Sequence, residues 1–312
     1  MNIGLDIMGG DFAPEATVLG AIAAQKALSA DQKIVLFGDK DQILSILSDQ
    51  QVNPAVFDYV HTTEMIGMGE HATKAVFQKP NSSISLGFTY LKEGKIDSFA
   101  SAGNTGAMLV GAMFSVKTID GVIRPAIASN IPKLKSGFGI LLDVGANADC
   151  KPDMLLQFGV LGSLYAEHIY KVPNPKVALM NLGEEEEKGN LLTQATYPLM
   201  KESKLFNFVG NIEGRDLFND KADVVVCDGF TGNVTLKLAE TFYVLTTEKG
   251  FKDEFLDRFN YEQYGGSPIL GINAPVLIGH GISSPEAIKN MILLSRTMIE
   301  TNLVDKIKEA FN

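Results

Sequence analysis

Tryptophan is absent from this 312-residue chain, which also contains only two cysteines and four histidines. Cys150 and Cys227 have neither the spacing of a metal-ligand pair nor the density of a disulfide framework, and the histidines form no cluster. We therefore expect no metal and no cofactor. No stretch approaches the ~18 consecutive apolar residues of a spanning helix, and no basic leader precedes the strand-like NIGLDI. The expected location is the cytoplasm.

An excess of positive charge is also missing, because 37 acidic residues against 27 basic ones give a net charge of −10. Sequence-independent binding of nucleic acid needs a basic surface that displaces counterions, so no nucleic-acid partner is expected. Residues 117–135 are a local exception, with four basic residues and one acidic residue. This segment is either a solvated loop or a docking surface for an acidic partner. The candidate docking residues are Arg124, Lys133 and Lys135.

The chain is rich in apolar, β-branched runs that alternate with helical patterns, which is typical of a parallel sheet covered by helices on both faces. Strands are expected within residues 3–7, 33–39, 96–101, 137–147, 176–183, 206–212, 222–229 and 274–281. Helices are expected over residues 14–28, 42–47 and 82–92, and around 108–116. The predicted fold class is a three-layer α/β/α domain spanning residues 1–312. Its approximate lobes, around a cleft, are 1–120 with 265–312, and 121–264.

Loops rich in Gly, Asn, Ser and Thr follow five of these strands, just before predicted helices, at residues 6–15, 101–107, 181–189, 228–233 and 279–286. The carboxyl ends of parallel strands meet at one sheet edge, and helix starts bind anions. The set predicts an anion site, whereas each loop alone also fits an ordinary sharp turn; Ser283 and Glu286 match a capping box. The candidate binding residues are Asp6, Gly9, Gly10, Ser101, Gly103, Asn104, Thr105, Gly106, Asp143, Asn147, Glu185, Asp228, Thr231, Gly232 and His280.

Two side chains carry the catalytic hypothesis. Lys188 follows the glutamates 184–187 at a predicted helix start, where one or two of them would orient its ammonium toward a substrate phosphate; a solvated acidic turn is the alternative. Asn233 closes the run DGFTGN and could donate to an oxyanion, or else cap a helix. No Ser–His–Asp set can be assembled and Cys227 is interpreted as a buried apolar residue, so covalent catalysis is not expected. Walker and Rossmann glycine patterns are absent.

A series of motifs resembles the PlsX phosphate acyltransferases along nearly the whole chain. In order, they are DIMGGDFAPE, KPNSSI, SAGNTGA, RPAIA, LLDVGAN, NLGEEEEKG, VGNIEGRDLF, VVVCDGFTGN and YGGSPILG. The resemblance implies a homodimer of the isocitrate/isopropylmalate dehydrogenase-like fold, shared with phosphotransacetylases. It also implies conversion of acyl-[acyl carrier protein] and inorganic phosphate to acyl phosphate and free carrier protein, for phospholipid synthesis. Phosphate would attack the thioester directly, with Lys188 steadying its charge and Asn233 stabilising the oxyanion.

Many members of that family hold a longer, basic helical pair where this chain has residues 241–263, and that pair is associated with peripheral membrane attachment. Here residues 240–262 contain six acidic and three basic residues, so only weak contact with the inner face of the membrane is expected. Three rival functions stay open: a phosphotransacetylase that uses coenzyme A, a binding scaffold without chemistry, and a nicotinamide-dependent dehydrogenase. The last is disfavoured because the sequence shows no metal-binding aspartate cluster.

Overall fold

The computed structural model describes residues 1–135 and 137–311, which divide into two compact units. Unit 1 comprises residues 1–117 and 261–300, and unit 2 comprises residues 118–260 and 301–312. This division differs from the expected lobes at the carboxyl terminus, because residues 301–312 belong with unit 2 and not with the N-terminal residues. The contacts of helix α11 (Leu303–Phe311) with α6 (Pro152–Tyr170) explain the difference.

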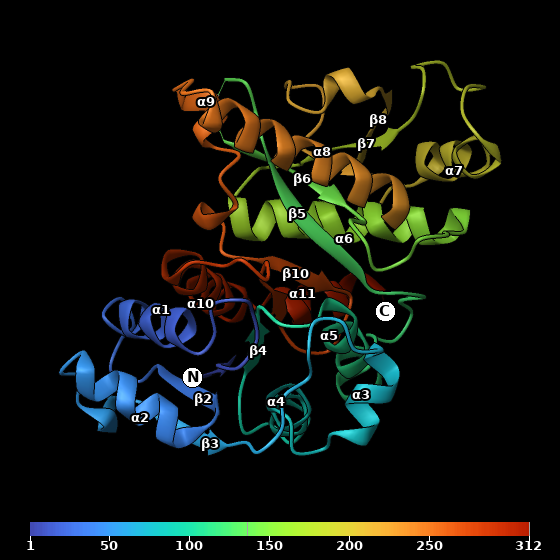
Figure 1. Cartoon of the computed structure of the whole chain (residues 1–312). Helices are drawn as coiled ribbons and strands as arrows, with labels where there is room; N and C mark the ends of the chain where they lie inside the picture. Colours follow the sequence, from blue (N-terminus) through green and yellow to red (C-terminus); the bar gives the residue numbers. More distant parts are fainter. Residues whose placement is uncertain (136, 312) are drawn as a thin grey trace. The chain divides into compact units, whose positions relative to one another are not determined.

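Unit 1 is built on strands in the order β3-β2-β1-β4-β11-β10, and among these described strands the β10–β11 pair is antiparallel and the other pairs are parallel. Strands β2, β3, β4 and β10 are labelled in Figure 1. The strands are β1 (Asn2–Asp6), β2 (Lys33–Gly38), β3 (Asp58–His61), β4 (Ser98–Ser101), β10 (Ser267–Leu270) and β11 (Val276–Ile278). The helices are α1 (Glu15–Gln25), α2 (Lys40–Asp49), α3 (Ala72–Gln78), α4 (Ser83–Lys92), α5 (Thr105–Gly111) and α10 (Pro285–Glu300). Short turns η1 (Pro54–Val56), η2 (Ala112–Val116) and η4 (Tyr261–Gln263) complete the unit.

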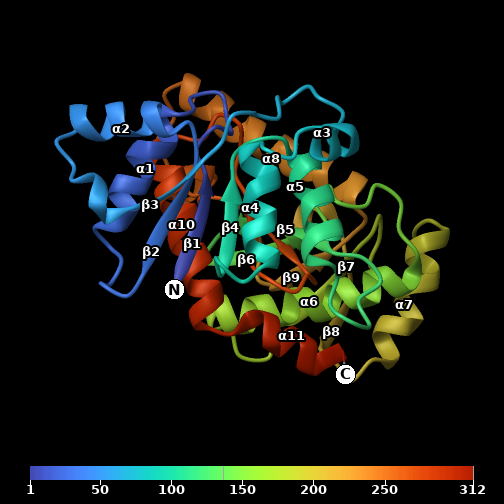
Figure 2. The ribbon, with the colours of Figure 1, turned by 90° about the horizontal axis from the view of Figure 1, so that it is seen from below.

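Helices cover both faces of the unit 1 strands. Helix α4 lies on the near side of β1 and β4 in Figure 2, and α10 lies behind them. Phe99 of β4 is fully buried and packs edge-on against Phe88 of α4 and Phe37 of β2. Because such aromatic contacts exclude water from both helix and strand, they fix α4 on this face of the sheet.

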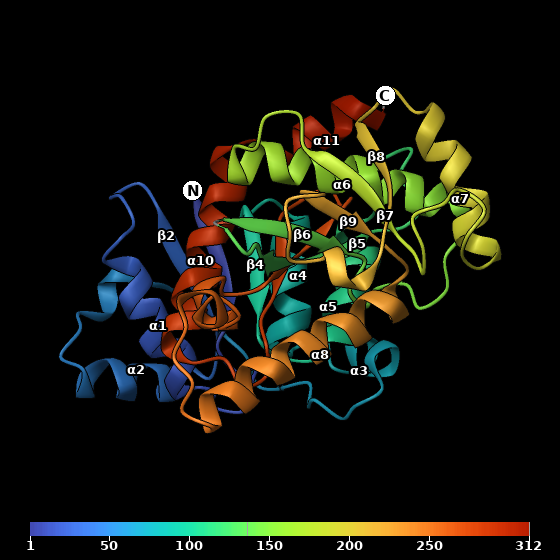
Figure 3. The ribbon, with the colours of Figure 1, turned by 90° about the horizontal axis from the view of Figure 1, so that it is seen from above.

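Unit 2 repeats this construction with the strand order β5-β6-β9-β7-β8, in which only the β5–β6 pair is antiparallel. The strands are β5 (Ala126–Pro132), β6 (Phe138–Leu142), β7 (Lys176–Met180), β8 (Asn207–Ile212) and β9 (Val224–Val226). The remaining elements are α6, α7 (Leu191–Glu202), η3 (Gly214–Asp216), α8 (Gly229–Glu248), α9 (Glu254–Asp257) and α11. Helices α6 and α8 lie on opposite sides of these strands (Figure 3).

The predicted mostly parallel α/β class is confirmed, since eight expected strands form and helices lie on both faces. Strands β3, β5 and β10 were not predicted. The helix expected around residues 108–116 ends at Gly111 and continues as the π-helical turn η2. The capping box expected at Ser283 is wrong: the hydroxyl of Ser284 accepts from the N–H of Ala287 at 3.4 Å, one residue further on.

Among the described residues, no helix is long and apolar enough to cross a bilayer.

Candidate active site

Three of the predicted anion-binding loops meet within unit 1, at the carboxyl ends of β1, β4 and β11. The register places Leu5 beside Ala100, and Ile278 beside Ser101, so these strands end together. The N–H of Gly279 donates to the carbonyl of Ser101 at 2.8 Å. The N–H of Asp11 donates to the carbonyl of Gly281 at 2.7 Å, which joins the first loop to the last. The convergence predicted for these loops is therefore present within this unit.

A buried carboxylate organises these loops. Asp6 is 1% exposed, and its Oδ2 accepts from the hydroxyl of Ser101 at 2.7 Å. The Ser101 hydroxyl in turn accepts from the N–H of Gly103 at 2.9 Å. Burial raises the pKa of Asp6 above its ordinary 3.8, against the opposing effect of hydrogen bonds from Ser101 and neighbouring groups. Gly9 packs so closely on Asp6 and Ser101 that a Cβ there would lie 2.5 Å from the Asp6 carboxylate.

The side chain of Asn104 is buried and forms hydrogen bonds with the backbone. Its Oδ1 accepts from the N–H of Ala107 at 2.9 Å, which makes it the N-cap of α5. Its amide nitrogen donates to the carbonyls of Gly67, Met68 and Glu70 at 3.0–3.1 Å. The neighbouring Thr105 is exposed, and Gly106 is half-buried.

The remaining unit 1 candidates lie in the same loops. Gly10 adopts a φ of +111°, which suits glycine, close to the carbonyl of Gly281. His280 is half-buried after β11, and its carbonyl accepts from the N–H of Ser283 at 3.0 Å. A direct role of these residues in substrate binding stays a prediction.

In unit 2, the fully buried carboxylate of Asp143 holds the loop that follows β6. Its Oδ1 accepts from the N–H groups of Ile127, Gly145 and Ala146 at 3.0–3.2 Å. Its Oδ2 accepts from the backbone and side-chain N–H groups of Asn147, at 2.7 and 2.9 Å. Burial nevertheless raises the pKa of Asp143 above 3.8. Asn147 also donates to the carbonyl of Pro125 at 2.8 Å, which ties this loop to the chain entering β5.

The start of α8 is anchored on this loop. The N–H of Gly229 donates to the carbonyl of Asn147 at 2.7 Å. Asp228 caps the helix by accepting from the N–H and hydroxyl of Thr231, each at 2.8 Å. Gly232 approaches so closely that a Cβ there would lie 1.9 Å from the carbonyl oxygen of Asp143. Any larger side chain at this position would push α8 away from the strand ends.

Asn233 lies in the second turn of α8, so its alternative role as N-cap is wrong; Asp228 caps the helix. One N–H of its amide donates to the carbonyl of Val144 at 3.0 Å, which fixes the direction of the side chain. The second N–H has no partner among the described residues, and Asn233 lines a cavity of about 320 Å³. The cavity is also lined by Gly145, Ala148, Gly229, Phe230 and Val234.

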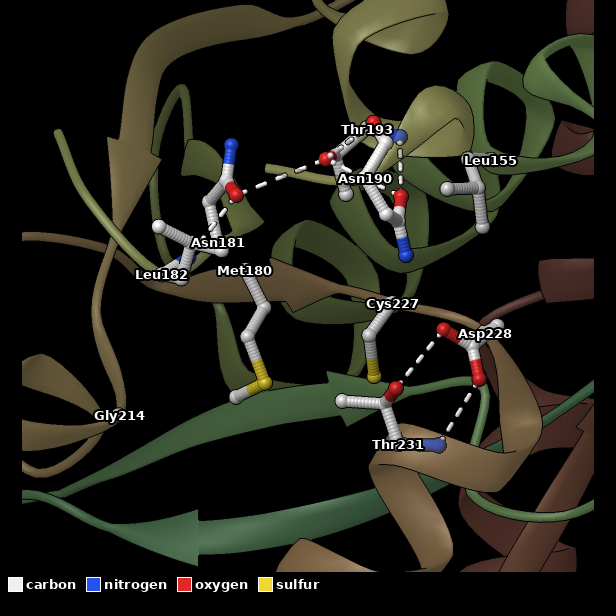
Figure 4. Close-up of a pocket in the computed structure, with 10 residues that line it drawn as sticks. All are labelled: Leu155, Met180, Asn181, Leu182, Asn190, Thr193, Gly214, Cys227, Asp228 and Thr231. Atoms are coloured by element: carbon white, nitrogen blue, oxygen red, sulfur yellow. Dashed lines mark hydrogen bonds between the residues drawn. The ribbon is translucent and has the colours of Figure 1, made fainter. Parts of the chain in front are cut away.

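A second cavity, of about 280 Å³, lies between the carboxyl ends of β7 and β9 (Figure 4). Asn190 and Thr193 of the α7 start line one side, and Asp228 and Thr231 of the α8 start line another. The remaining lining residues are Leu155, Met180, Asn181, Leu182, Gly214 and Cys227. The first turn of α8 contributes residues to both cavities.

The acidic run before Lys188 is a loop, so the helix start predicted there is wrong; α7 begins only at Leu191, with Asn190 as its cap. The reason is local: Gly189 has a φ of +104°, and the Asn181 amide donates to the Lys188 carbonyl at 3.0 Å. Lys188 is exposed, and no carboxylate of the described residues forms an ion pair with it.

The glutamates of this loop do not orient Lys188 through ion pairs. Glu184 pairs with Lys221 at 2.6 Å, and Glu186 pairs with Lys201. Glu185 contributes its backbone carbonyl, which accepts from the N–H of Lys188 at 3.2 Å and from the amide of Asn211 at 3.0 Å. The loop is therefore positioned by Asn181 and Asn211, and a role of the Lys188 ammonium in binding a ligand stays a prediction.

The basic segment does not present all three of its candidate docking residues, because two of them form ion pairs. Lys133 is 8% exposed and forms an ion pair with Asp223, so it is structural and unsuited to docking. Lys135 is exposed but pairs with Asp220 at 2.9 Å. Arg124 is exposed and forms no ion pair with the described carboxylates, which leaves it as the strongest of the three docking candidates.

The cysteines do not offer a reactive thiolate. Cys227 is 3% exposed, as the apolar interpretation predicts, and burial raises the pKa of its thiol well above 9.0. Burial and the nearby Asp143 raise the pKa of the Cys150 thiol to about 12. Among the described residues, no group of three or more His, Cys, Asp or Glu side chains is placed to hold a metal ion.

Residues 1–255 match the model of the fatty acid synthesis protein family. The chain belongs to this family. A phosphate acyltransferase of Dictyoglomus turgidum is 44% identical over all of this chain and 98% of its own length. One from Desulforamulus reducens is 43% identical over 99% of this chain and 97% of its own. These relationships identify the chain as an acyltransferase enzyme and confirm the resemblance found in its motifs.

Solved structures support the fold of this family member. A phosphotransacetylase from Streptococcus pyogenes superposes with a TM-score of 0.66 at 15% identity, covering 96% of this chain and 94% of its own. The EutD phosphotransacetylase from Staphylococcus aureus gives 0.65 at 17% identity with the same coverage. A 4-hydroxythreonine-4-phosphate dehydrogenase from Klebsiella pneumoniae gives 0.51 at 13%, over 94% of this chain and 96% of its own. The predicted fold class is therefore confirmed.

Sequence reasoning missed the residues that line the second cavity of this acyltransferase. Asn190 and Thr193 follow the acidic run, and the helix start predicted at that run lies upstream of the true N-cap, Asn190. The signal was the Gly189–Asn190 pair, because glycine and asparagine are frequent where a helix begins after a turn. Phe230 was not among the predicted site residues either. Its side chain is 67% exposed and borders the Asn233 cavity.

Proposed function

We propose that this enzyme transfers a fatty acyl group from acyl carrier protein to inorganic phosphate, an early step of phospholipid synthesis. An oxygen of phosphate attacks the thioester carbonyl carbon, a C–O bond forms, and the C–S bond breaks. The products are acyl phosphate and the carrier thiolate, which takes up a proton from solvent. Phosphate is itself the nucleophile, so the enzyme needs to position the reactants and stabilise charge. This agrees with a unit 2 site whose cysteines are buried or of raised pKa.

The observation that carries the proposal is the anchored amide of Asn233. One N–H of the amide donates to the carbonyl of Val144. The other N–H has no partner among the described residues, and the side chain lines the cavity. Such a preorganised donor stabilises the oxyanion of the tetrahedral intermediate without reorientation, which in other enzymes contributes about 3 kcal/mol. Phe230 and Val234 give this cavity an apolar wall suited to the acyl group.

Lys188 supplies the positive charge. Its ammonium is exposed and free of ion pairs with the described carboxylates, so it is available to a phosphate. We assign it the role of holding the charge of the attacking phosphate. The participation of the SAGNTGA loop of unit 1 in phosphate binding remains a prediction.

Incubation of the purified enzyme with palmitoyl-carrier protein tests the reaction. Release of the carrier thiol should require phosphate, and acyl phosphate should appear in equal amount. If palmitoyl-coenzyme A or acetyl-coenzyme A supports the reaction far better than the carrier substrate, the phosphotransacetylase alternative is favoured. Inertness toward every thioester would favour a binding scaffold.

Lys188→Ala and Asn233→Ala should each lower turnover by roughly a hundredfold, because each removes a group that acts on charge developing in the reaction. Circular dichroism and thermal unfolding should show that both variants fold. Lys204→Ala, which removes another exposed lysine of unit 2, is the matched control and should keep full turnover. Near-normal turnover of either active-site variant removes that residue from the mechanism.

Carrier proteins are acidic, and we propose that Arg124 contributes to docking them. Arg124→Glu should raise KM for the acyl-carrier substrate about tenfold with little change in kcat, and added salt should reduce the difference, because an exposed charge acts mainly on encounter. Lys26→Glu, a charge reversal on unit 1, serves as the control. An unchanged KM would show that the carrier docks elsewhere.

We also propose that the chain forms a homodimer through α8. Leu238, Phe242 and Leu245 are 48–58% exposed and recur at helical spacing along one face, beyond the two residues that line the Asn233 cavity. A continuous exposed apolar face of this kind is typical of an association surface. The acidic residues around α9 argue against an anionic membrane as the partner.

Leu238→Glu should convert the dimer to a monomer in sedimentation velocity, because it places a charge in the middle of this apolar face. Thr247→Glu, an exposed position on the opposite side of α8, should remain dimeric. A wild-type chain that sediments as a monomer and binds anionic vesicles through Leu238 would contradict this proposal.

A further inference from the structure

The cavity between β7 and β9 has no part in the chemistry assigned to Asn233 and Lys188. It lies on the other side of the first α8 turn: Asp228 and Thr231 face it, whereas Phe230, Asn233 and Val234 line the neighbouring cavity. The loop that carries Lys188 also borders it, through Asn181 at one end and Asn190 at the other (Figure 4). The cavity therefore shares the α8 start with the Asn233 cavity and borders the loop that carries Lys188.

The lining excludes the two simplest occupants. None of its ten residues is positively charged, and Asp228 is a carboxylate, so a phosphate group would be repelled. Five of the ten carry amide, hydroxyl or carboxylate groups, which makes the cavity too polar for a bare acyl chain. The other side chains are apolar: Leu155, Met180, Leu182 and Cys227. This mixture suits an uncharged ligand with alternating amide and hydrocarbon segments.

Asn190 offers such a ligand one oriented donor. Its Oδ1 accepts from the N–H of Thr193 at 2.9 Å, which determines which side of the amide carries the nitrogen. The nitrogen has no partner among the described residues, and Figure 4 shows it directed into the space between Leu155 and Cys227. By contrast, the polar atoms of Asp228 and Thr231 bond to each other.

We propose that this cavity binds the pantetheine arm of the thioester substrate. An amide carbonyl of the arm accepts from the Asn190 side chain, and the dimethyl segment packs against Leu155 and Met180. A volume of about 280 Å³ lies at the lower end for small-molecule sites, which fits a slender chain. The proposal rests on the proposed function, and it adds that the thioester is held by its arm as well as by the carrier protein surface.

The test uses pantetheine alone, without acyl group, carrier protein or phosphate. Asn190→Asp keeps an oxygen that caps α7 but replaces the donor nitrogen with an acceptor, so the helix should be retained. Calorimetry should show that wild-type enzyme binds pantetheine and that this variant binds it at least tenfold more weakly. Asn53→Asp makes the same exchange at the cap of η1, where Oδ1 accepts from the N–H of Ala55, and should bind as the wild type does.

A second variant fills the cavity. Gly214 lines it, and a Cβ added there meets no atom within 4 Å, so Gly214→Leu introduces bulk without a clash at its Cβ. This variant should also lose pantetheine binding while unfolding at the wild-type temperature. The kinetics should show the same loss of affinity. In Asn190→Asp, KM for acyl-pantetheine should rise about tenfold, and kcat should stay within a factor of a few.

Three results would overturn the proposal. The first is no binding of pantetheine by the wild type, the second is binding by both Asn190→Asp and Gly214→Leu that is as tight as that of the wild type, and the third is a loss of kcat in Asn190→Asp without a change in KM. The proposed function is tested by a separate assay, the phosphate-dependent release of thiol from the acyl-carrier substrate. Binding of pantetheine without that release would reject the acyl transfer and leave the pocket. Release with unaltered pantetheine binding in both variants would reject the pocket and leave the acyl transfer.

Discussion

The architecture of the unit 2 site depends on one buried carboxylate. Asp143 has no exposed surface, and five N–H donors converge on its two oxygens. Leaving a buried donor unpaired costs about 1–3 kcal/mol, so the loop after β6 has little freedom to adopt another path. The same loop presents the carbonyl of Val144 to Asn233 and the carbonyl of Asn147 to Gly229. Removal of this carboxylate would therefore disturb the start of α8 and the direction of the proposed oxyanion donor together.

Around this anchor, unit 2 holds its charged and uncharged candidate groups on different elements. Lys188 lies on an exposed loop and pairs with no described carboxylate, whereas Asn233 carries an uncharged donor on a fixed helix turn. The cavity at the α7 start is uncharged apart from Asp228, whose carboxylate accepts from the hydroxyl of Thr231. Under the proposed function, a dianion such as phosphate would meet Lys188, and a neutral amide chain would meet the uncharged cavity. Stabilising charge in this way requires no covalent nucleophile, in agreement with the raised pKa values of both cysteines.

The sequence predicts the fold class and the loop groups well, because both follow from local patterns. Apolar, β-branched runs can only be buried in a covered sheet, and parallel strands bring their carboxyl ends to one edge. Asp6, Ser101 and Gly103 accordingly meet in unit 1, and Asp143, Asn147 and Asp228 lie on neighbouring strand ends in unit 2.

What the sequence could not predict depends on tertiary contacts. Lys133 looked like a docking residue until the strand pairing brought it beside Asp223, 90 residues away. The run of glutamates favours a helix start by its charge, but the left-handed Gly189 and the Asn181 side chain hold it as a loop. The pocket beside Asn190 combines five separate segments, and no local pattern joins Leu155, Met180 and Thr231. These features follow from packing between distant residues, which composition and periodicity do not encode.

Hydrogen exchange of Asp143→Asn tests the central role of this carboxylate most directly. The amide nitrogen that replaces one oxygen cannot accept, so the N–H groups facing it, either those of Gly145 and Ala146 or that of Asn147, should exchange at least tenfold faster. The amides of β1 in unit 1 provide the internal reference and should exchange at their wild-type rates. Unchanged protection of all three loop amides, with Asn233 still bonded to Val144, would contradict the account.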